Sequence, residues 1–180
     1  MHSLLPFLES SYTAYQAVEN ARALLLEQGF CELKEQQPWE LTTGGKYFVT
    51  RGGSAVIAFR VGDASRGFKI VASHTDSPAL KLKSSPALSD ENATRLNVEP
   101  YGGGIYYSYF DRPLKLAGRL IREEEGELVS TSYVSDFFVS LPSVAIHLNR
   151  EVNKAFVPDQ QADQPLLSLG AAQFDLVTKG

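Results

Sequence analysis

The sequence predicts an α/β protein in which a helix and several strands come first and a β-rich segment follows. Three observations carry this prediction. Residues 14–28 repeat apolar side chains at helical spacing, residues 46–61 have the pattern of a β-hairpin, and residues 68–73 form a short apolar strand. The order helix, hairpin, strand is typical of the first layer of an α/β domain.

The helix and the hairpin carry clear end signals. Thr13 is placed to cap the start of the helix, and Gly29 is placed to end it. In the hairpin, KYFVT and AVIAFRV flank residues 51–54 (RGGS), whose glycines suit a tight turn. Residues 1–11 lack a basic region and a long apolar stretch, so they predict a short structural helix, with His2 on the surface, and not a signal peptide.

The pattern changes after residue 83. Residues 84–86 (SSP) and 89–92 (SDEN) indicate a crossing between substructures. We therefore expect two domains, residues 1–86 and residues 87–180, the second of them incomplete.

Strand alternation dominates the second of these domains. Leucines at positions 114, 116 and 120 share one parity, and residues 127–134 and 136–140 predict two more strands. Residues 143–154, which follow Pro142, are compatible with a short helix, although the apolar pattern there is weak.

Composition restricts the function classes. The net charge of -4, with the 17 basic residues scattered, argues against a nucleic-acid partner. No apolar run approaches the ~20 residues that a membrane-spanning helix needs. The single cysteine, Cys31, excludes an intramolecular disulfide and argues against a cysteine-based zinc site. The sequence therefore predicts a cytoplasmic protein with no membrane contact.

The stretch SHTDSP (residues 73–78) is the candidate site. His74 ends an apolar strand, where α/β proteins commonly place ligands. In extended backbone, residues i and i+2 point to the same side, so His74 and Asp76 are expected to lie together, the imidazole binding a metal and the carboxylate fixing its tautomer. The alternative is a hydrogen bond that only caps a turn. A serine nucleophile is not indicated, because Ser77 lies outside any G-x-S-x-G turn.

Four blocks, in this order, resemble the aspartyl aminopeptidase family of co-catalytic zinc metallopeptidases. The stretch SHTDSPALKLK resembles the zinc-site motif of the family. The other three blocks are GGKYFVTR (44–51), YGGG with FDR and LAGR (101–119), and LPSVAIHLNR (141–150). The chain departs from the family pattern at residues 12–16, which lack the usual proline and histidine, at Ser108-Tyr109, where a tryptophan is usual, and at Pro113, which replaces an acid. These departures concern local packing or subunit contacts and leave HTDSP intact.

The resemblance implies a fold and an activity. Residues 1–86 would form the N-terminal part of an α/β/α zinc-peptidase catalytic domain, and residues 87–180 an inserted, β-rich dimerisation domain. The activity implied is that of a zinc-dependent aminopeptidase, a homo-oligomer with two zinc ions per complete site, which removes N-terminal Asp or Glu from peptides. By resemblance His74 is a zinc ligand, Asp76 is the active-site carboxylate that orients it, and His147 binds substrate in the site of a neighbouring subunit.

Other interpretations stay open for some of these residues. A histidine between Ile146 and Leu148 also fits a core position, which is the alternative for His147. Asp111 and Arg112 are an adjacent acid and base in a β-rich region, so we expect them to form a structural ion pair. The YGGG turn lacks G-x-G-x-x-G spacing and a following helix, so it is not a phosphate loop.

The remaining zinc ligands and the general base of the family have no matching block. His147 is the only histidine after His74, and Asp159, Asp163 and Asp175 stand in no recognisable ligand motif. We therefore expect the 180-residue chain to be the N-terminal portion of such an enzyme, inactive by itself. The alternative is a non-catalytic oligomerisation module of the same family. A third interpretation is a protein of unrelated function that binds one zinc ion or no metal. It would require that all four matches to the sequence blocks of the family are accidental.

Overall fold

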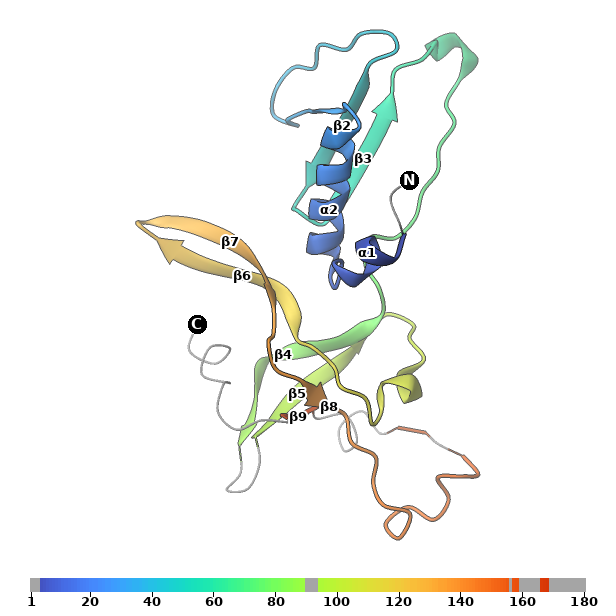
Figure 1. Ribbon diagram of the computed structural model, residues 1–180, viewed down its shortest axis with the longest axis vertical. Helices are drawn as coiled ribbons and strands as arrows, with labels where there is room; N and C mark the ends of the chain where they lie inside the picture. Colours follow the sequence, from blue (N-terminus) through green and yellow to red (C-terminus); the bar gives the residue numbers. More distant parts are fainter. Residues whose placement is uncertain (1–3, 90–93, 156, 159–165, 169–180) are drawn as a thin grey trace. The chain divides into compact units, whose positions relative to one another are not determined.

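The computed structural model describes residues 4–89, 94–155, 157–158 and 166–168 (Figure 1). His2 and the aspartates at 159, 163 and 175 lie outside these residues. The chain divides into two compact units, Met1–Ser77 and Pro78–Gly180. The domain boundary expected at residues 86/87 falls inside a strand of the second unit, and the division into functional domains stays a prediction.

The first unit combines helices with a small mixed sheet, in agreement with the predicted α/β class (Figure 1). Helix α2 contacts β3 and β1, and α1 contacts α2. The elements are α1 (Leu4–Glu9), α2 (Ala14–Glu27), β1 (Cys31–Glu32), β2 (Lys46–Arg51), β3 (Ala55–Arg60) and the 3-10 turn η1 (Ala64–Arg66). No helix among the described residues is long and apolar enough to span a bilayer.

Helix α2 begins and ends as predicted. The Thr13 side chain accepts a hydrogen bond from the backbone N–H of Gln16 at 3.5 Å. At the other end, the N–H of Gln28 donates to the carbonyl of Leu24, and Gly29 follows with a φ of +75°. A left-handed residue after the last turn is the usual glycine-based end of a helix.

The predicted hairpin is also confirmed. Strands β2 and β3 pair antiparallel from Lys46↔Arg60 to Arg51↔Ala55, and β1 lies parallel to β2. The turn needs positive φ at Gly52 (+59°) and Gly53 (+70°), which glycine adopts without steric cost. Phe48 of β2 is fully buried, and burial of a side chain of this size stabilises the unit by up to about 3 kcal/mol.

The strand predicted at Phe68–Ser73 is wrong. The segment forms no strand, and the exposed fractions of Phe68, Ile70 and Val71 are 85%, 84% and 99%. The sheet of this unit ends at β3 within the described residues. An apolar run with high β-propensity becomes a strand only when another strand supplies its hydrogen bonds, and none does so here.

The second unit contains a four-stranded sheet in the order β4-β5-β9-β8 and a separate two-stranded sheet, β6-β7. Its elements are β4 (Ala79–Ser89), β5 (Thr94–Tyr101), the 3-10 turn η2 (Tyr106–Tyr109), β6 (Ala117–Glu124), β7 (Glu127–Val134), β8 (Val139–Ser140) and β9 (Leu166–Ser168). The core lies on the four-stranded sheet and consists of Leu96, Val98, Val139, Leu141 and Leu166.

Several predictions for this unit need correction. The crossing expected at residues 84–86 lies within β4, where the pairing with β5 shifts register between Leu82 and Ala87; residues 90–92 are outside the described part. The strand at 127–134 is confirmed, whereas only Val139 and Ser140 of the expected strand 136–140 pair. Residues 143–154 contain turns and no helix; Val144, Ile146 and Leu148 are exposed, and Val152 is half-buried. Most of the stability of a helix in a protein comes from packing of its apolar face, and three of these four side chains contribute little to such a face.

Candidate metal centre

His74 and Asp76 lie together, as the i, i+2 spacing predicts. His74 Nδ1 and Asp76 Oδ1 are 2.9 Å apart, and the exposed fractions of the two side chains are 90% and 38%. An ionised carboxylate can only accept a hydrogen bond, so Nδ1–H is the donor. In the neutral imidazole the free lone pair is then on Nε2, on a side chain that solvent reaches. This is the tautomer in which histidine binds a metal through Nε2.

Thr75, between these two residues, anchors the loop. Its hydroxyl donates a hydrogen bond of 2.7 Å to the carbonyl of Ser54, in the turn between β2 and β3. The loop that carries His74 and Asp76 is thereby attached to the hairpin of its own unit. Sequence reasoning missed this contact, because no local signal links Thr75 to a residue 21 positions earlier.

His74 and Asp76 fit part of a zinc site, namely one ligand and the group that orients it. Zinc takes three or four protein ligands, from His, Cys, Asp or Glu. The described residues contain no group of three or more such side chains that could hold a metal ion. His74 fits a ligand and Asp76 fits the group that orients it, but these two do not complete a coordination shell.

His147 is exposed, so the core position considered for it is wrong. It lies in a turn in which the N–H groups of Leu148 and Asn149 donate to the carbonyl of Ala145, at 2.8 and 3.3 Å. Its neighbours Ile146 and Leu148 are exposed as well. His147 belongs to the second compact unit and His74 to the first. Within the first unit the structure brings His74 together with Asp76.

Asp111 supports the segment that leads to His147. Its carboxylate accepts hydrogen bonds from the backbone N–H of Ser143 at 2.9 Å and from the Ser143 hydroxyl. Its own N–H donates to the carbonyl of Leu141 at 2.9 Å. The hydrogen bonds from Ser143 hold the pKa of Asp111 below its ordinary value; the hydroxyl has the larger effect and the backbone N–H the smaller one. Arg112 donates to the carbonyl of Ser108. Asp111 and Arg112 therefore both make structural contacts, but the predicted ion pair between them does not form.

The YGGG turn packs against Pro78, at the end of the SHTDSP stretch. A Cβ added at Gly102 would lie 3.5 Å from the Cα of Pro78, and one at Gly104 would lie 3.2 Å from its Cβ. The hydroxyl of Tyr109 donates to the Pro78 carbonyl at 2.8 Å. Gly102 and Gly104 therefore allow this turn to pack closely against Pro78.

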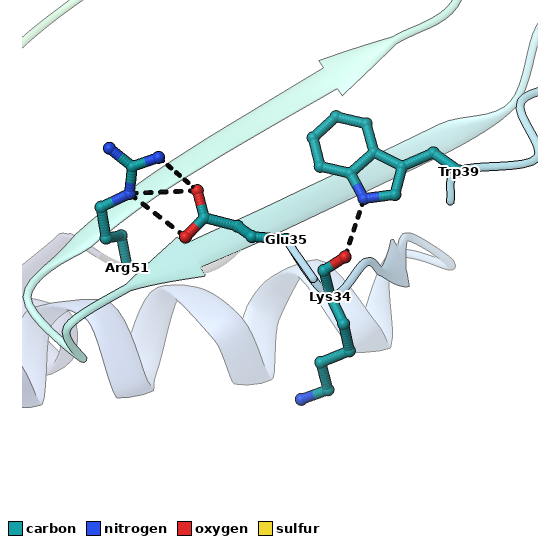
Figure 2. Close-up of polar contacts among 4 residues, drawn as sticks. All are labelled: Lys34, Glu35, Trp39 and Arg51. Carbon is teal, nitrogen blue, oxygen red and sulfur yellow. Dashed lines mark hydrogen bonds and ion pairs between the residues drawn. The ribbon is translucent and has the colours of Figure 1, made fainter. Parts of the chain in front are cut away.

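Polar contacts of the GGKYFVTR block are structural (Figure 2). Figure 2 shows the Arg51 guanidinium against the Glu35 carboxylate, with Nη2–Oε1 at 2.5 Å and Nε–Oε1 at 3.0 Å. This pair lowers the pKa of Glu35 and raises that of Arg51. The indole N–H of Trp39 donates to the carbonyl of Lys34 at 2.9 Å. These bonds hold the long loop before β2.

Comparisons with known proteins agree on one family. Residues 7–176 match the family described as aminopeptidase I zinc metalloprotease (M18). A probable M18 family aminopeptidase 2 of Clostridium acetobutylicum is 39% identical over 96% of this chain and 42% of its own length. Aspartyl aminopeptidase 1 of Schizosaccharomyces pombe is 38% identical over 92% of this chain and 37% of its own length.

Solved structures give the same result. The cryo-EM structure of the Ape4 and Nbr1 complex has a TM-score of 0.84 at 37% identity, over 91% of this chain and 32% of that chain. The crystal structure of prApe1 has a TM-score of 0.81 at 27% identity, over 93% of this chain and 37% of that chain. The chain thus spans about two fifths of the length of the relatives it matches.

Proposed function

Because the chain belongs to the M18 family of aminopeptidases, we propose that it is a polypeptide of a zinc-dependent aminopeptidase that removes N-terminal acidic residues from peptides. Acidic specificity is supported by relatives in Ricinus communis and Schizosaccharomyces pombe that are named as probable aspartyl aminopeptidase and aspartyl aminopeptidase 1. We further propose a cytoplasmic location. The observation that carries the proposal is the 2.9 Å contact between His74 Nδ1 and Asp76, which leaves Nε2 in the metal-binding form.

In this proposal the two residues have separate roles. His74 binds one of two zinc ions through Nε2, and Asp76 fixes the tautomer and the direction of the ring. Zinc, when bound, supplies Lewis acidity and lowers the pKa of a bound water toward ~7. Because the described residues contribute one histidine ligand, the other ligands and the general base come from outside them, and the 180-residue chain alone is inactive.

His147 has a role in substrate binding in this proposal. An exposed imidazole on a turn can reach a second molecule, and exposed apolar neighbours are common where a surface is covered by a partner. We assign residues 1–86 to the catalytic domain and residues 87–180 to an inserted dimerisation domain. In a homo-oligomer His147 then contacts the peptide bound at a neighbouring subunit. A donor aimed at the developing oxyanion is worth roughly 3 kcal/mol of transition-state stabilisation.

A second candidate is a non-catalytic oligomerisation module of the same family. The observation that favours it is the absence of a three-ligand group among the described residues. The two candidates differ in one measurable property, because a module without catalytic use needs no zinc affinity at His74.

The test is an assay of the purified chain with aspartyl and leucyl chromogenic amides, with zinc or cobalt and with a chelator control. We expect no turnover. Metal-dependent turnover that prefers the aspartyl amide would support the aminopeptidase activity. It would also contradict the proposal that the metal site of this chain is incomplete.

Zinc titration of the same chain then separates the two candidates. In the aminopeptidase, weak zinc binding is lost in H74A and reduced in D76N, whereas H147A binds zinc like the parent. Zinc binding that does not depend on His74 favours the non-catalytic module.

A further inference from the structure

The stretch that carries the candidate metal centre has little backbone support. Residues 68–75 contain no strand and make no backbone–backbone hydrogen bond within the described part of the chain. Two side-chain contacts hold the end of this stretch. His74 Nδ1 lies 2.9 Å from Asp76 Oδ1. The Thr75 hydroxyl donates to the Ser54 carbonyl at 2.7 Å, and this bond attaches the stretch to the β2–β3 hairpin.

The acceptor of the Thr75 hydroxyl belongs to a well-supported turn. The N–H of Ser54 donates to the Arg51 carbonyl at 3.2 Å, and the antiparallel pairing of β2 with β3 begins directly beside it, at Arg51↔Ala55. The turn also lies close to α2, because a Cβ added at Gly53 would be 3.7 Å from Cδ1 of Tyr15. The Ser54 carbonyl is therefore a fixed point within the first compact unit.

The side chain of Thr75 faces the hairpin, whereas that of His74 faces solvent. Thr75 is half-buried with its hydroxyl on Ser54, and the His74 side chain is 90% exposed. Side chains alternate along extended backbone, so a Thr75 side chain on the hairpin directs those of His74 and Asp76 away from it. Threonine is branched at Cβ and has few rotamers, so a bond to its hydroxyl also restricts its backbone. The stretch is thus fixed at the residue between the imidazole and the carboxylate.

We propose that Thr75 is a positioning residue of the metal centre, which holds the His74 imidazole and the Asp76 carboxylate in the arrangement that binds zinc. The inference rests on the proposed function, in which His74 binds zinc through Nε2. A ligand that is ordered before the metal arrives loses less conformational entropy on binding, so the metal binds more tightly. Thr75 itself contacts neither the imidazole nor the metal, and it acts through the backbone that joins His74 to Asp76.

Zinc titration of the 180-residue chain measures the effect on metal affinity. T75V removes the hydroxyl at nearly constant shape and should lower the zinc affinity about fivefold, less than the roughly 10–100-fold loss typical of a group that contacts the ligand directly. T75S keeps the donor and should bind zinc like the parent. T42V is the matched control, because it removes a hydroxyl that lies 3.2 Å from the Tyr47 hydroxyl in the same unit, and it should leave zinc affinity unchanged.

The His74 ring gives a second readout that needs no zinc. At about pH 8.5, where free imidazole is neutral, the ¹⁵N signals of the ring report which nitrogen carries the proton. The parent and T75S should hold the Nδ1–H form. T75V should show a mixture of both tautomers, because the Asp76 carboxylate no longer stays opposite Nδ1. A purely structural role of Thr75 would lower the stability of T75V without changing the tautomer in the folded chain.

The two readouts together decide the inference. Support requires both changes in T75V, the weaker zinc binding and the mixed tautomer. An unchanged tautomer, an unchanged zinc affinity, or losses of equal size in T75V and either T75S or T42V would overturn it. If H74A binds zinc as well as the parent does, the zinc ligand of the proposed function is wrong. The tautomer in T75V then still shows whether Thr75 orders the contact between His74 and Asp76.

Discussion

Asp111 and Ser143 are joined by two hydrogen bonds although they are 32 positions apart in the chain. Asp111 has a φ of +56°, in the left-handed region that aspartate and asparagine tolerate better than most residues. Its backbone and its side chain together tie the turn after η2 to the segment that begins at Leu141. The segment carrying His147 therefore starts from a fixed point.

The Asp111 contact should make stability depend on pH at the acidic end. The folded-state pKa of Asp111 is lowered, so its stabilising contribution is fully present above the unfolded-state pKa of about 3.9 and is lost as the pH falls through the lower folded value. S143A should lower the free energy of unfolding by about 1 kcal/mol at pH 7, a figure reduced for solvent exposure, and by much less near pH 2. Urea unfolding at the two pH values measures this, with S143T as the control that keeps a hydroxyl. An equal loss at both pH values would contradict the role of the carboxylate.

Removal of the Thr75 hydroxyl should loosen the loop of the candidate site. T75V leaves the Ser54 carbonyl without its 2.7 Å partner, at a cost of about 1 kcal/mol, while T75S keeps the donor. Hydrogen exchange of the amides at residues 73–77 should be faster in T75V than in the parent and T75S. If T75S and T75V behave alike, the hydroxyl does not anchor the loop.

The glycines of the YGGG turn should differ in their tolerance of alanine. G102A introduces a Cβ at a φ of +75° and at 3.5 Å from Pro78, so it should destabilise the chain by about 1–2 kcal/mol. G103A adds a Cβ with nothing within 4 Å and no positive φ, so it should be neutral or slightly stabilising. Thermal unfolding of both variants measures the difference. Similar losses in the two would show that flexibility of the turn, and not space at Gly102, matters.

The apolar run after the first hairpin should accept a charge. Val71 is almost fully exposed, so V71D should change the free energy of unfolding by less than about 0.5 kcal/mol and reduce binding of a hydrophobic dye. F48A in the buried part of β2 is the contrasting variant, with an expected loss of about 3–5 kcal/mol. A loss above about 2 kcal/mol in V71D would mean that residues 68–73 pair in solution.

Local signals predicted the parts of the fold that depend on near neighbours. The cap at Thr13, the stop at Gly29 and the glycine turn of the first hairpin follow from steric preferences of single residues. The contact between His74 and Asp76 follows from the alternation of extended backbone. Each of these needs only a few consecutive residues.

Predictions failed where a distant partner decides the outcome. Residues 68–73 have the composition of a strand, but strand formation requires a neighbour that no local pattern reports. The core position that was the alternative for His147 rested on its apolar neighbours, yet His147 is exposed. The anchor from Thr75 to Ser54 was equally invisible, because it depends on how the chain folds back.

The pairing of β5 with β9 has a kinetic consequence. Leu96 and Leu166 are partners about 70 residues apart, whereas β6 and β7 are joined by a two-residue turn. A hairpin forms in about 1–10 μs, but a long loop must lose more chain entropy before its ends meet. During synthesis, β6–β7 can form long before Leu166 leaves the ribosome. Leu96 and Val98 then wait for β9, and that interval is when this sheet is most exposed to aggregation.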